Sequence, residues 1–473
     1  MIPLCPICLG NAGPIDKDHE IVSPAPDPHS CALCFGLLSD MTLCDEIVNK
    51  ATEEYKREGY DGYNFILALN LPITMHLREA VLDKLLDGKF VPATMSPKNV
   101  YANFLMSKIS KASGLHPSLK SDLILTVTVS NDEFCESDEQ FLTFHFPEEF
   151  RNSKNKKRHR SNNDAPHAYS KVKINNIETS MTIETAKKYP MASSTQRCTI
   201  SVKYERDSVY IAGRYCKYSR SLPQSPWAAD DEDLKVENSI SEKVGLAMTK
   251  LCRADTFRFI ASGREDIDVR MLGQGRPFAV NLINARTIHA LLSKSTFDSL
   301  AEQINQKNPD IKVNFLTRVT AKQVLELNVG QEGTFLFCQC VIVASFNLEK
   351  RKTYSALCYS KVPLTEEIMQ RLRTCAPVEI TQKTVIRVLK RRPLIDRKRT
   401  IFSLNAYQLD EYHFIAKLET QAGTYVKEFV HGDFGRTRPC LPLLMGLELD
   451  QVDILQLDVE AVDLEWPPKR NVL

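Results

Sequence analysis

The stretch Ser262–Phe278, SGREDIDVRMLGQGRPF, decides how the rest of this chain is interpreted. An alternating aromatic run, Thr256 to Ile260, precedes it and predicts a half-buried strand. The stretch itself carries three acidic residues, three arginines and three glycines. Such a loop can hold one carboxylate beside guanidinium groups while the glycines let a large substrate approach the backbone. The composition suits a carboxylate that acts on a polyanion, but a solvated surface turn with salt bridges has the same composition.

The letters GRED, which end at Asp266, resemble the G-R-x-D loop of pseudouridine synthases, whose aspartate is catalytic. The longer run SGREDIDVRMLGQGRPFAV is similar to the archaeal and eukaryotic tRNA pseudouridine-54/55 synthase family, which carries a THUMP-containing accessory domain. The resemblance makes Asp266 the catalytic carboxylate. Asp268 shares a face with Asp266 if the segment is extended, so spacing alone leaves both residues open.

Two further motifs carry the same resemblance. The letters KTY, ending at Tyr354, resemble the K-x-Y strand whose tyrosine packs on the target base, although a tyrosine on a strand is usually core or rim packing. The letters GTYVK, ending at Lys427, resemble the G-T-Y-[IV]-[RK] element, in which the basic residue pairs with the catalytic aspartate. A cation there favours the charged form of the carboxylate. Either Val426 or Phe429 could wall the uracil pocket.

Basic residues interleaved with tyrosines predict a surface for loop or single-stranded RNA. One such cluster is GRYCKYSR at 213–220, and the densest basic segment runs from Lys383 to Arg399. Core packing of the tyrosines and a solvated basic face are the alternatives. The residues expected to contact RNA are Arg214, Tyr215, Lys217, Tyr218, Arg220, Arg264, Arg270, Arg276, Arg387, Lys390, Arg391, Arg392, Tyr425 and Arg436.

Two C-x-x-C knuckles near the N-terminus are separated by 22 residues. Cys5, Cys8, Cys31 and Cys34 can present four thiolates to one tetrahedral zinc ion. Four protein ligands leave no open position for water, so the zinc is expected to be structural. Free thiols or a disulfide are the alternatives. No organic cofactor is expected, because the chain shows no convincing P-loop or dinucleotide fingerprint.

At 473 residues, with 43% hydrophobic and 25% charged residues, the chain is expected to be globular with two or three domains. The expected class is α+β: an N-terminal zinc-knuckle and THUMP-like α/β part, then a pseudouridine synthase domain. The resemblance implies that the catalytic sheet is mixed and mostly antiparallel. The expected divisions are 1–41 for the knuckles, 42–227 for the accessory domain with a basic mobile loop at 151–170, and 228–473 for the catalytic domain.

Two local patterns predict strands. Alternating runs at 198–204 and 208–215 predict a β-hairpin. The apolar run at 333–345 predicts a buried strand.

The expected function is that of an isomerase that converts uridine to pseudouridine in the TΨC arm of tRNA, at position 55 with position 54 as a second candidate. A pseudouridine synthase for another RNA and a non-catalytic zinc-containing RNA-binding scaffold are the alternatives. The expected partner is tRNA. No association with a membrane is expected, since no run of about 18 apolar residues occurs. The N-terminus lacks a secretory pattern, and the expected compartments are the nucleus and the cytoplasm. The protein is expected to be a monomer.

Overall fold

A computed structural model describes the chain in eight ranges: residues 1–11, 21–27, 30–86, 97–150, 169–226, 239–328, 351–390 and 392–468. The chain forms two compact units, Met1–Asp207 and Ser208–Leu473. Sheets and helices occur in both units, so the expected α+β class is confirmed. The strand expected at 333–345 and the basic loop expected at 151–170, apart from its last two residues, lie outside the described residues.

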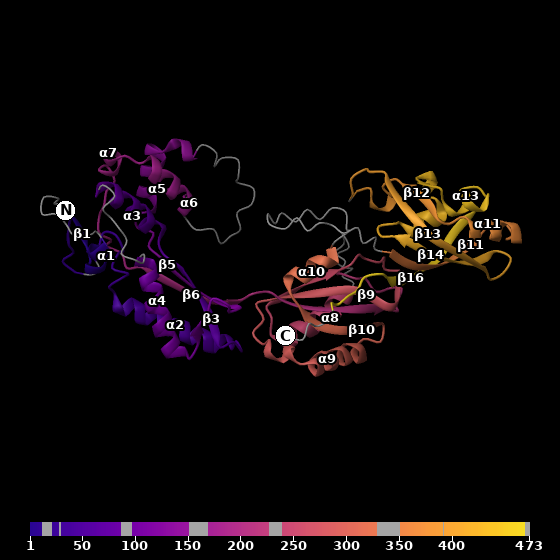
Figure 1. The fold of residues 1–473 in the computed structure, drawn as a ribbon, viewed down its shortest axis with the longest axis horizontal. Helices are drawn as coiled ribbons and strands as arrows, with labels where there is room; N and C mark the ends of the chain where they lie inside the picture. The colour runs from indigo at the N-terminus through magenta and orange to yellow at the C-terminus, as the bar shows by residue number, and fades with distance from the viewer. Residues whose placement is uncertain are drawn as a thin grey trace, which may run out of the picture. The chain divides into compact units, whose positions relative to one another are not determined.

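The first unit combines helices with a four-stranded sheet and a short strand pair (Figure 1). Its strands are β1 (Ile2–Leu4), β2 (Val22–Pro24), β3 (Asn64–Asn70), β4 (His116–Pro117), β5 (Leu123–Ser130) and β6 (Thr199–Arg206). Its helices are α1 (Pro6–Asn11), α2 (Met41–Glu58), α3 (Ile73–Leu85), α4 (Pro97–Ser113), α5 (Cys135–His145), α6 (Lys171–Ser180) and α7 (Ile183–Ala186). The sheet order is β4-β3-β5-β6, with β5 parallel to β3 and antiparallel to β6.

Local sequence explains why α2 begins and ends where it does. The Asp40 carboxylate accepts a hydrogen bond from the Leu43 backbone N–H at 3.0 Å and so caps the first turn. Gly59 ends the helix in the left-handed conformation at φ 66°, which glycine adopts without steric cost. Ile47 and Ala51 are fully buried, so this face of α2 packs into the core of the unit.

A buried arginine ties three segments of the first unit together. The Arg78 guanidinium, on α3, donates hydrogen bonds to the carbonyl of Ala32 and, at 2.7 Å, to the carbonyl of Ala192. The ring centroids of Phe35 and Phe134 lie 4.7 Å and 4.1 Å from the guanidinium carbon. Because Ala32 stands between two of the knuckle cysteines, Arg78 anchors the second knuckle to the helical core.

The second unit is organised on a ten-stranded sheet. Its strands are β7 (Val209–Lys217), β8 (Thr256–Ala261), β9 (Arg270–Ile283), β10 (Ile311–Val319), β11 (Arg351–Ser360), β12 (Val378–Gln382), β13 (Arg397–Gln408), β14 (His413–Gln421), β15 (Thr437–Arg438) and β16 (Val452–Val462). Its helices are α8 (Ile240–Cys252), α9 (Lys294–Lys307), α10 (Ala321–Asn328), α11 (Glu366–Thr374), α12 (Val426–His431) and α13 (Leu441–Met445). Its 3₁₀ turns are η3 (His289–Leu292), η4 (Ile386–Val388) and η5 (Asp433–Gly435).

The sheet order is β10-β7-β9-β16-β11-β14-β13-β12-β15, with β8 also paired to β9. Among the described strands of this unit, β9 and β16 form the single parallel pair, so the sheet is mixed and mostly antiparallel. The hairpin expected from residues 198–215 is wrong, because β6 pairs with β5 in the first unit while β7 pairs with β9 and β10 in the second. Local alternation identified both strands but could not identify their partners.

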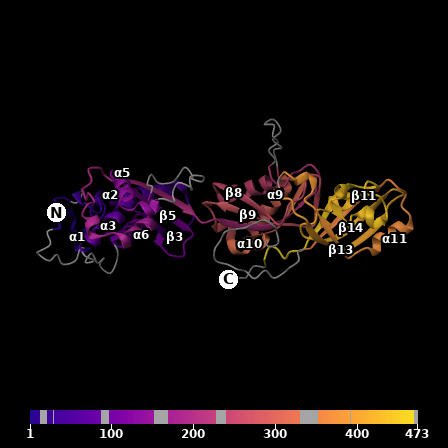
Figure 2. The same cartoon turned by 90° about the horizontal axis from the view of Figure 1, so that it is seen from above.

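Helices cover both faces of the strands β7, β9 and β10 (Figures 1 and 2). Ile211 and Val280 pack into the cluster that includes α8 and α9, whereas their neighbours Ala212 and Ala279 pack with α10. Adjacent residues of a strand point to opposite faces, so α10 lies on the face opposite α8 and α9. In the described part of the chain, no helix is both long and apolar enough to cross a bilayer.

The centre of the sheet brings two sequence motifs together. Val459 of β16 is paired with Met271 at the start of β9 and with Tyr354 of β11. The loop 262–269 enters β9 at this point, and Tyr354 stands two strands away across the sheet. The parallel β9–β16 pairing therefore places the acidic loop and the tyrosine beside the same strand.

Replacing Arg78 with methionine is expected to lower the free energy of unfolding of the first unit by about 3 kcal/mol, because the carbonyls of Ala32 and Ala192 lose their buried donor. Urea unfolding, followed by hydrogen exchange of amides in β3 and β5, measures the loss. Arg197→Met is the matched control. Its side chain is 54% exposed, so a change below about 0.5 kcal/mol is expected. Equal losses for both variants would contradict the anchoring role of Arg78.

Candidate active site

A buried ion pair lies beneath the loop that joins β8 to β9. The Arg276 guanidinium donates to the Glu265 carboxylate at 2.7 Å, and the two side chains are 2% and 0% exposed. The Tyr215 phenol donates to the same carboxylate at 2.9 and 3.0 Å, and the Gln224 amide donates to the phenol oxygen at 2.6 Å. Charge pairing and filled lone pairs offset the cost of burying Glu265. Glu265 is held inward while its neighbour Asp266, 40% exposed, faces the cavity.

A buried lysine fixes the backbone of the same loop. The Lys217 ammonium donates to the carbonyls of Leu222, Asp266 and Ile267 at 2.9, 3.1 and 2.8 Å. Burial lowers the pKa of Lys217 to about 8. Three carbonyl acceptors match the three N–H groups of an ammonium, so the charged form is fully hydrogen-bonded at this position.

The structure corrects the expected RNA contacts of Arg214, Tyr215, Lys217 and Arg276. Their side chains are buried, with exposures of 4%, 0%, 0% and 2%. The Arg214 guanidinium donates to four backbone carbonyls, one in β9 and three in the segment that ends β16 and follows it. Because these polar groups are engaged inside the protein, none of the four side chains can reach an RNA at the surface. Tyr215, Lys217 and Arg276 position the loop, and Arg214 ties β7 to β9 and to the segment after β16.

Two cations contact the carboxylate of Asp266. One oxygen lies 3.0 Å from the Arg387 guanidinium, and the other lies 3.3 Å from the Lys427 ammonium. Arg387 also donates to Glu428 at 2.6 Å, and Glu428 is only 3% exposed. The Nε atom of Arg387 is thus bound to the buried Glu428 carboxylate, while its Nη1 atom contacts Asp266.

Lys427 is shared between two carboxylates. Its ammonium donates to both oxygens of Asp268, at 2.8 and 2.7 Å, in addition to its contact with Asp266. Partial burial acts to raise the pKa of the Asp268 carboxyl, but the hydrogen bonds from Lys427 outweigh it and hold the pKa below its ordinary value. Asp268 is the more exposed of the two acids, at 58% against 40%.

The three residues of the sequence motifs, Asp266, Tyr354 and Lys427, line one cavity of about 1010 Å³. Tyr354 is half-buried in this wall, and burial raises the pKa of its phenol to about 12. Val426 also lines the cavity, whereas Phe429 is fully buried and lies outside the lining. The structure therefore selects Val426 of the two apolar residues that the sequence left open.

Basic residues, some exposed and some half-buried, form the rim of this cavity. The arginines in the lining, apart from the buried Arg276, are Arg264, Arg387, Arg392, Arg397 and Arg399. Tyr425 lines the same cavity, and the Arg387 guanidinium carbon lies 5.6 Å from the centre of its ring. Cations around an aromatic wall are the combination that a nucleic acid requires for its phosphates and bases.

Other residues expected to contact RNA are turned towards the protein. Arg220 and Arg270 both form ion pairs with Asp458, at 2.7 and 2.5 Å. Arg436 donates to the carbonyl of Thr384 at 2.6 Å. These three arginines brace β16 and the segment after β12.

Two of the remaining expected residues are exposed. Tyr218 is 43% exposed at the end of β7, and Lys390 is exposed after η4. Arg391 lies outside the described residues.

Sequence reasoning missed the supporting acids and the amide. Glu265 stands inside the recognised motif, but no sequence signal showed that it is the buried member while Asp266 is the open one. Gln224 and Glu428 carried no signal of their own. Arg387 was expected on the RNA surface, and its direct contact with Asp266 follows only from the folding of η4 against α12.

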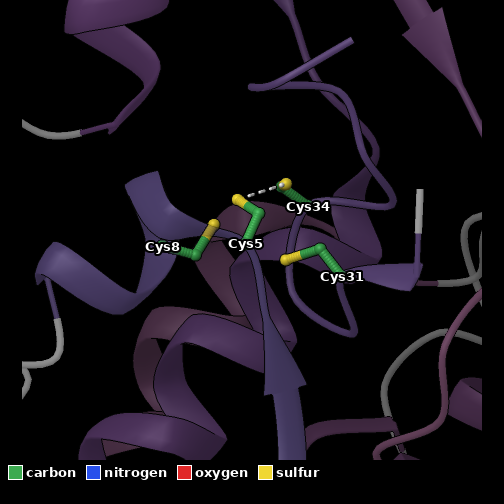
Figure 3. Close-up of side chains that lie close together, drawn as sticks. All are labelled: Cys5, Cys8, Cys31 and Cys34. Atoms are coloured by element: carbon green, nitrogen blue, oxygen red, sulfur yellow. Dashed lines mark hydrogen bonds between the residues drawn. The ribbon is translucent and has the colours of Figure 1, made fainter. Parts of the chain in front are cut away.

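The knuckle cysteines converge at one point of the first unit (Figure 3). The sulfur atoms of Cys5, Cys8, Cys31 and Cys34 all lie within 4.8 Å of one another, and all four residues are buried. Four thiols from two C-x-x-C turns are the donor set of a tetrahedral structural zinc site. The residues present therefore fit such an ion.

Known proteins share sequence with both units. A family model described as "Pus10, C-terminal" matches residues 210–463, and one described as "Eukaryotic Pus10, N-terminal" matches residues 31–202. "tRNA pseudouridine synthase Pus10" of Mus musculus is 33% identical over 466 residues, which cover 96% of this chain and 82% of that protein. The Homo sapiens protein of the same name is 32% identical over 450 residues, covering 93% and 79%. That of Thermofilum pendens is 35% identical over 258 residues, covering 54% and 52%.

Arg276→Met is expected to lower the free energy of unfolding of the second unit by about 4 kcal/mol, because it leaves the buried Glu265 carboxylate without its cation. Calorimetric unfolding measures this loss. Arg270→Met removes an arginine that is 37% exposed and should cost less than about 1 kcal/mol. The double variant Glu265→Gln/Arg276→Met should be more stable than Arg276→Met alone, since no charge stays buried. A double variant less stable than the single one would refute the pairing.

Proposed function

Because this chain belongs to the Pus10 family of tRNA pseudouridine synthases, we propose that its second unit isomerises uridine with Asp266 as the reacting carboxylate. The chain is an isomerase that converts uridine in tRNA to pseudouridine. The reaction breaks the N1–C1′ bond, joins C5 to C1′, and moves a proton from C5 to N1. Atoms and electrons balance within the nucleotide, so the isomerisation consumes no second substrate.

The observation that carries this proposal is the position of the Asp266 carboxylate, between Arg387 at 3.0 Å and Lys427 at 3.3 Å in the lining of the cavity. The two cations orient the carboxylate and limit its rotation, which favours one approach to a ribose carbon. In one route Asp266 attacks C1′, and in the other it removes the proton from C2′. Both routes need the same placement of the carboxylate oxygen.

Tyr354 supplies the wall on which the extruded uracil rests. A base must leave the RNA stack before a side chain can reach its C1′ atom, and an aromatic face compensates for the lost stacking. With its pKa raised to about 12, the phenol of Tyr354 stays protonated near neutral pH. The residue therefore stacks and donates a hydrogen bond, and phenolate chemistry at C5 is disfavoured.

The basic rim supports an RNA substrate. Arg264 is exposed on the loop that carries Asp266, and Arg392, Arg397 and Arg399 line the same cavity. Each cation that neutralises a phosphate adds a salt-dependent increment to affinity. The intact constellation of Asp266, arginine, lysine and tyrosine argues against a non-catalytic scaffold.

We propose the TΨC arm as the substrate region, with position 55 and also position 54 as targets. The proposal is supported by the similarity of the loop motif at 262–280 to synthases of that specificity. We further propose that the first unit is a THUMP-containing module that grips the tRNA away from the target uridine. We also propose that the protein is a monomer and that it occurs in the nucleus and the cytoplasm. The basic run at 151–160 supports the nuclear location.

We propose that the buried four-cysteine cluster holds one zinc ion. Zinc bound there would supply structural cross-linking of the two knuckles and, with four thiolates around it, no open position for a substrate. Cys5 and Cys8 bring α1 to the second knuckle, and Arg78 fixes that knuckle to α3 through the carbonyl of Ala32. Metal binding would thus contribute to the folding of the first unit.

Asp266→Asn is expected to lower the single-turnover rate of pseudouridine formation at least about 10³-fold, because the amide neither attacks carbon nor accepts a proton. Carbodiimide mapping of a tRNA transcript measures the product. The Kd for tRNA should change by less than about threefold, since no rim cation is lost. Asp268→Asn is the matched control, with a loss below about tenfold expected. A rate for Asp266→Asn equal to wild type would remove the assignment.

Changing Cys5 and Cys8 to serine is expected to abolish bound zinc and to lower the solubility and thermal stability of the full chain. Elemental analysis of the purified protein measures the metal. The single-turnover rate of the soluble fraction should stay within about threefold of wild type, because the cluster belongs to the first unit. Cys44→Ser, a buried cysteine outside the cluster, should retain one zinc per chain. Native protein without zinc would contradict the site.

A further inference from the structure

Four consecutive residues after α12 adopt positive φ angles. Gly432, Asp433, Phe434 and Gly435 have φ values of 83°, 48°, 53° and 84°. Glycine reaches this region freely, but a side chain with a Cβ atom is strained there, and a bulky residue more than most. The chain therefore holds two strained residues side by side, between two glycines that allow the turn.

Asp433 has a structural reason for its conformation. Its side chain is 5% exposed and accepts a hydrogen bond from the Ile386 backbone N–H at 3.3 Å. Its own backbone N–H donates to the His431 ring at 3.1 Å. Arg436, just after the turn, donates to the carbonyl of Thr384 at 2.6 Å. The turn is thereby fastened to the segment that carries Arg387 to the catalytic carboxylate.

No contact of this kind explains the strained conformation of Phe434. Its side chain is 91% exposed, and its ring stacks on no aromatic ring or cation among the described residues. A glycine or an asparagine would fit the backbone with less strain, and a polar residue would suit the exposure. Neither packing nor backbone geometry explains a phenylalanine at this position.

The surroundings of Phe434 are cationic and close to the active site. Lys383 and Arg438 are exposed, and Lys383 donates its backbone N–H to the carbonyl of Arg436 at 3.0 Å. Arg438 donates to the carbonyl of Gly435 at 3.3 Å. The turn directly follows α12, which carries Lys427, and only about 6 Å of helix separates Lys427 from the last residue before the turn. An exposed ring among cations is what an unpaired nucleobase and its phosphates recognise.

We propose that Phe434 is a stacking platform for an unpaired nucleobase of the RNA substrate, a few nucleotides from the target uridine. This inference rests on the proposed function, in that RNA must occupy the rim of the cavity. The strained turn keeps the ring projecting into solvent before RNA arrives, so that little order has to be created on binding. Lys383 and Arg438 then lie where the adjoining phosphates pass.

The test uses the full chain and a fluorescently labelled tRNA transcript. Phe434→Ala should raise both the Kd, measured by anisotropy, and the KM about tenfold, while the single-turnover rate at saturating tRNA stays unchanged. Phe434→Tyr should bind within about threefold of wild type, because it keeps the ring. Phe434→Leu should bind as weakly as the alanine variant, because it is apolar without a π-face. A leucine variant that binds as wild type would overturn stacking.

Phe315 provides a matched control. It is also a phenylalanine of positive φ, 58°, and is 60% exposed, but it lies on the edge strand β10 and not on the turn after α12. Phe315→Ala should leave the Kd for tRNA unchanged. Equal losses for Phe315→Ala and Phe434→Ala would overturn the proposal, as would a Phe434→Ala variant that binds tRNA like wild type.

Phe434→Gly separates the role in binding from a role in folding. Relief of the strained backbone should raise the thermal midpoint by about 2 °C while the Kd for tRNA rises about tenfold. A glycine variant that loses stability and binding together would instead show a folding role and overturn the proposal. Failure of the proposed function would give a different result from failure of this inference. Wild-type protein would then bind tRNA without forming pseudouridine. The difference in Kd between the alanine and tyrosine variants would still decide the role of Phe434.

Discussion

The buried pair of Glu265 and Arg276 is the interaction on which the loop 262–269 depends. Two charges can remain in an apolar interior only if each is paired and hydrogen-bonded, and here Tyr215 and Gln224 complete the set. The carboxylate next in sequence cannot enter the same site, so it faces the cavity. A polar network that is fully satisfied also rigidifies the segment that it holds. The loop thus keeps one geometry although it has no regular secondary structure between β8 and β9.

Buried cations serve as ties in both units. Arg78 joins α3 to the second cysteine knuckle, Arg214 joins β7 to β9 and to the segment after β16, and Lys217 holds the loop 262–269. Each uses backbone carbonyls, which are present whatever the side chains are. A guanidinium offers five donors and an ammonium three, so a single residue can fix several irregular segments. These hydrogen bonds fix the positions of irregular loops, as backbone hydrogen bonds between strands fix the positions of strands in a sheet.

The charges around Asp266 form a shared network. Lys427 serves two carboxylates, Asp266 and Asp268, and Arg387 serves another two, Asp266 and Glu428. Arg387 and Lys427 are each shared with a second carboxylate, so neither cation covers Asp266. The arrangement therefore holds the Asp266 carboxylate and leaves one side of it open to the cavity. The hydrogen bond to Glu428 fixes the orientation of the Arg387 guanidinium. Asp433, in the strained turn after α12, accepts a hydrogen bond from the backbone of Ile386 and so holds the neighbouring backbone.

Local sequence was sufficient for the α+β class, for the cysteine cluster, and for Asp266, Tyr354 and Lys427 as residues that belong together. Those inferences rest on spacing and on motifs within a few residues, which survive in any tertiary context. The partners of β6 and β7, the burial of Arg214, Tyr215, Lys217 and Arg276, and the contact of Arg387 with Asp266 were decided only by the tertiary structure. The alternating pattern of a strand does not specify which other strand it pairs with. An arginine next to a tyrosine in the sequence is found both on protein surfaces and in protein cores. Pairing and burial depend on atoms far along the chain, so the same local pattern fits either outcome.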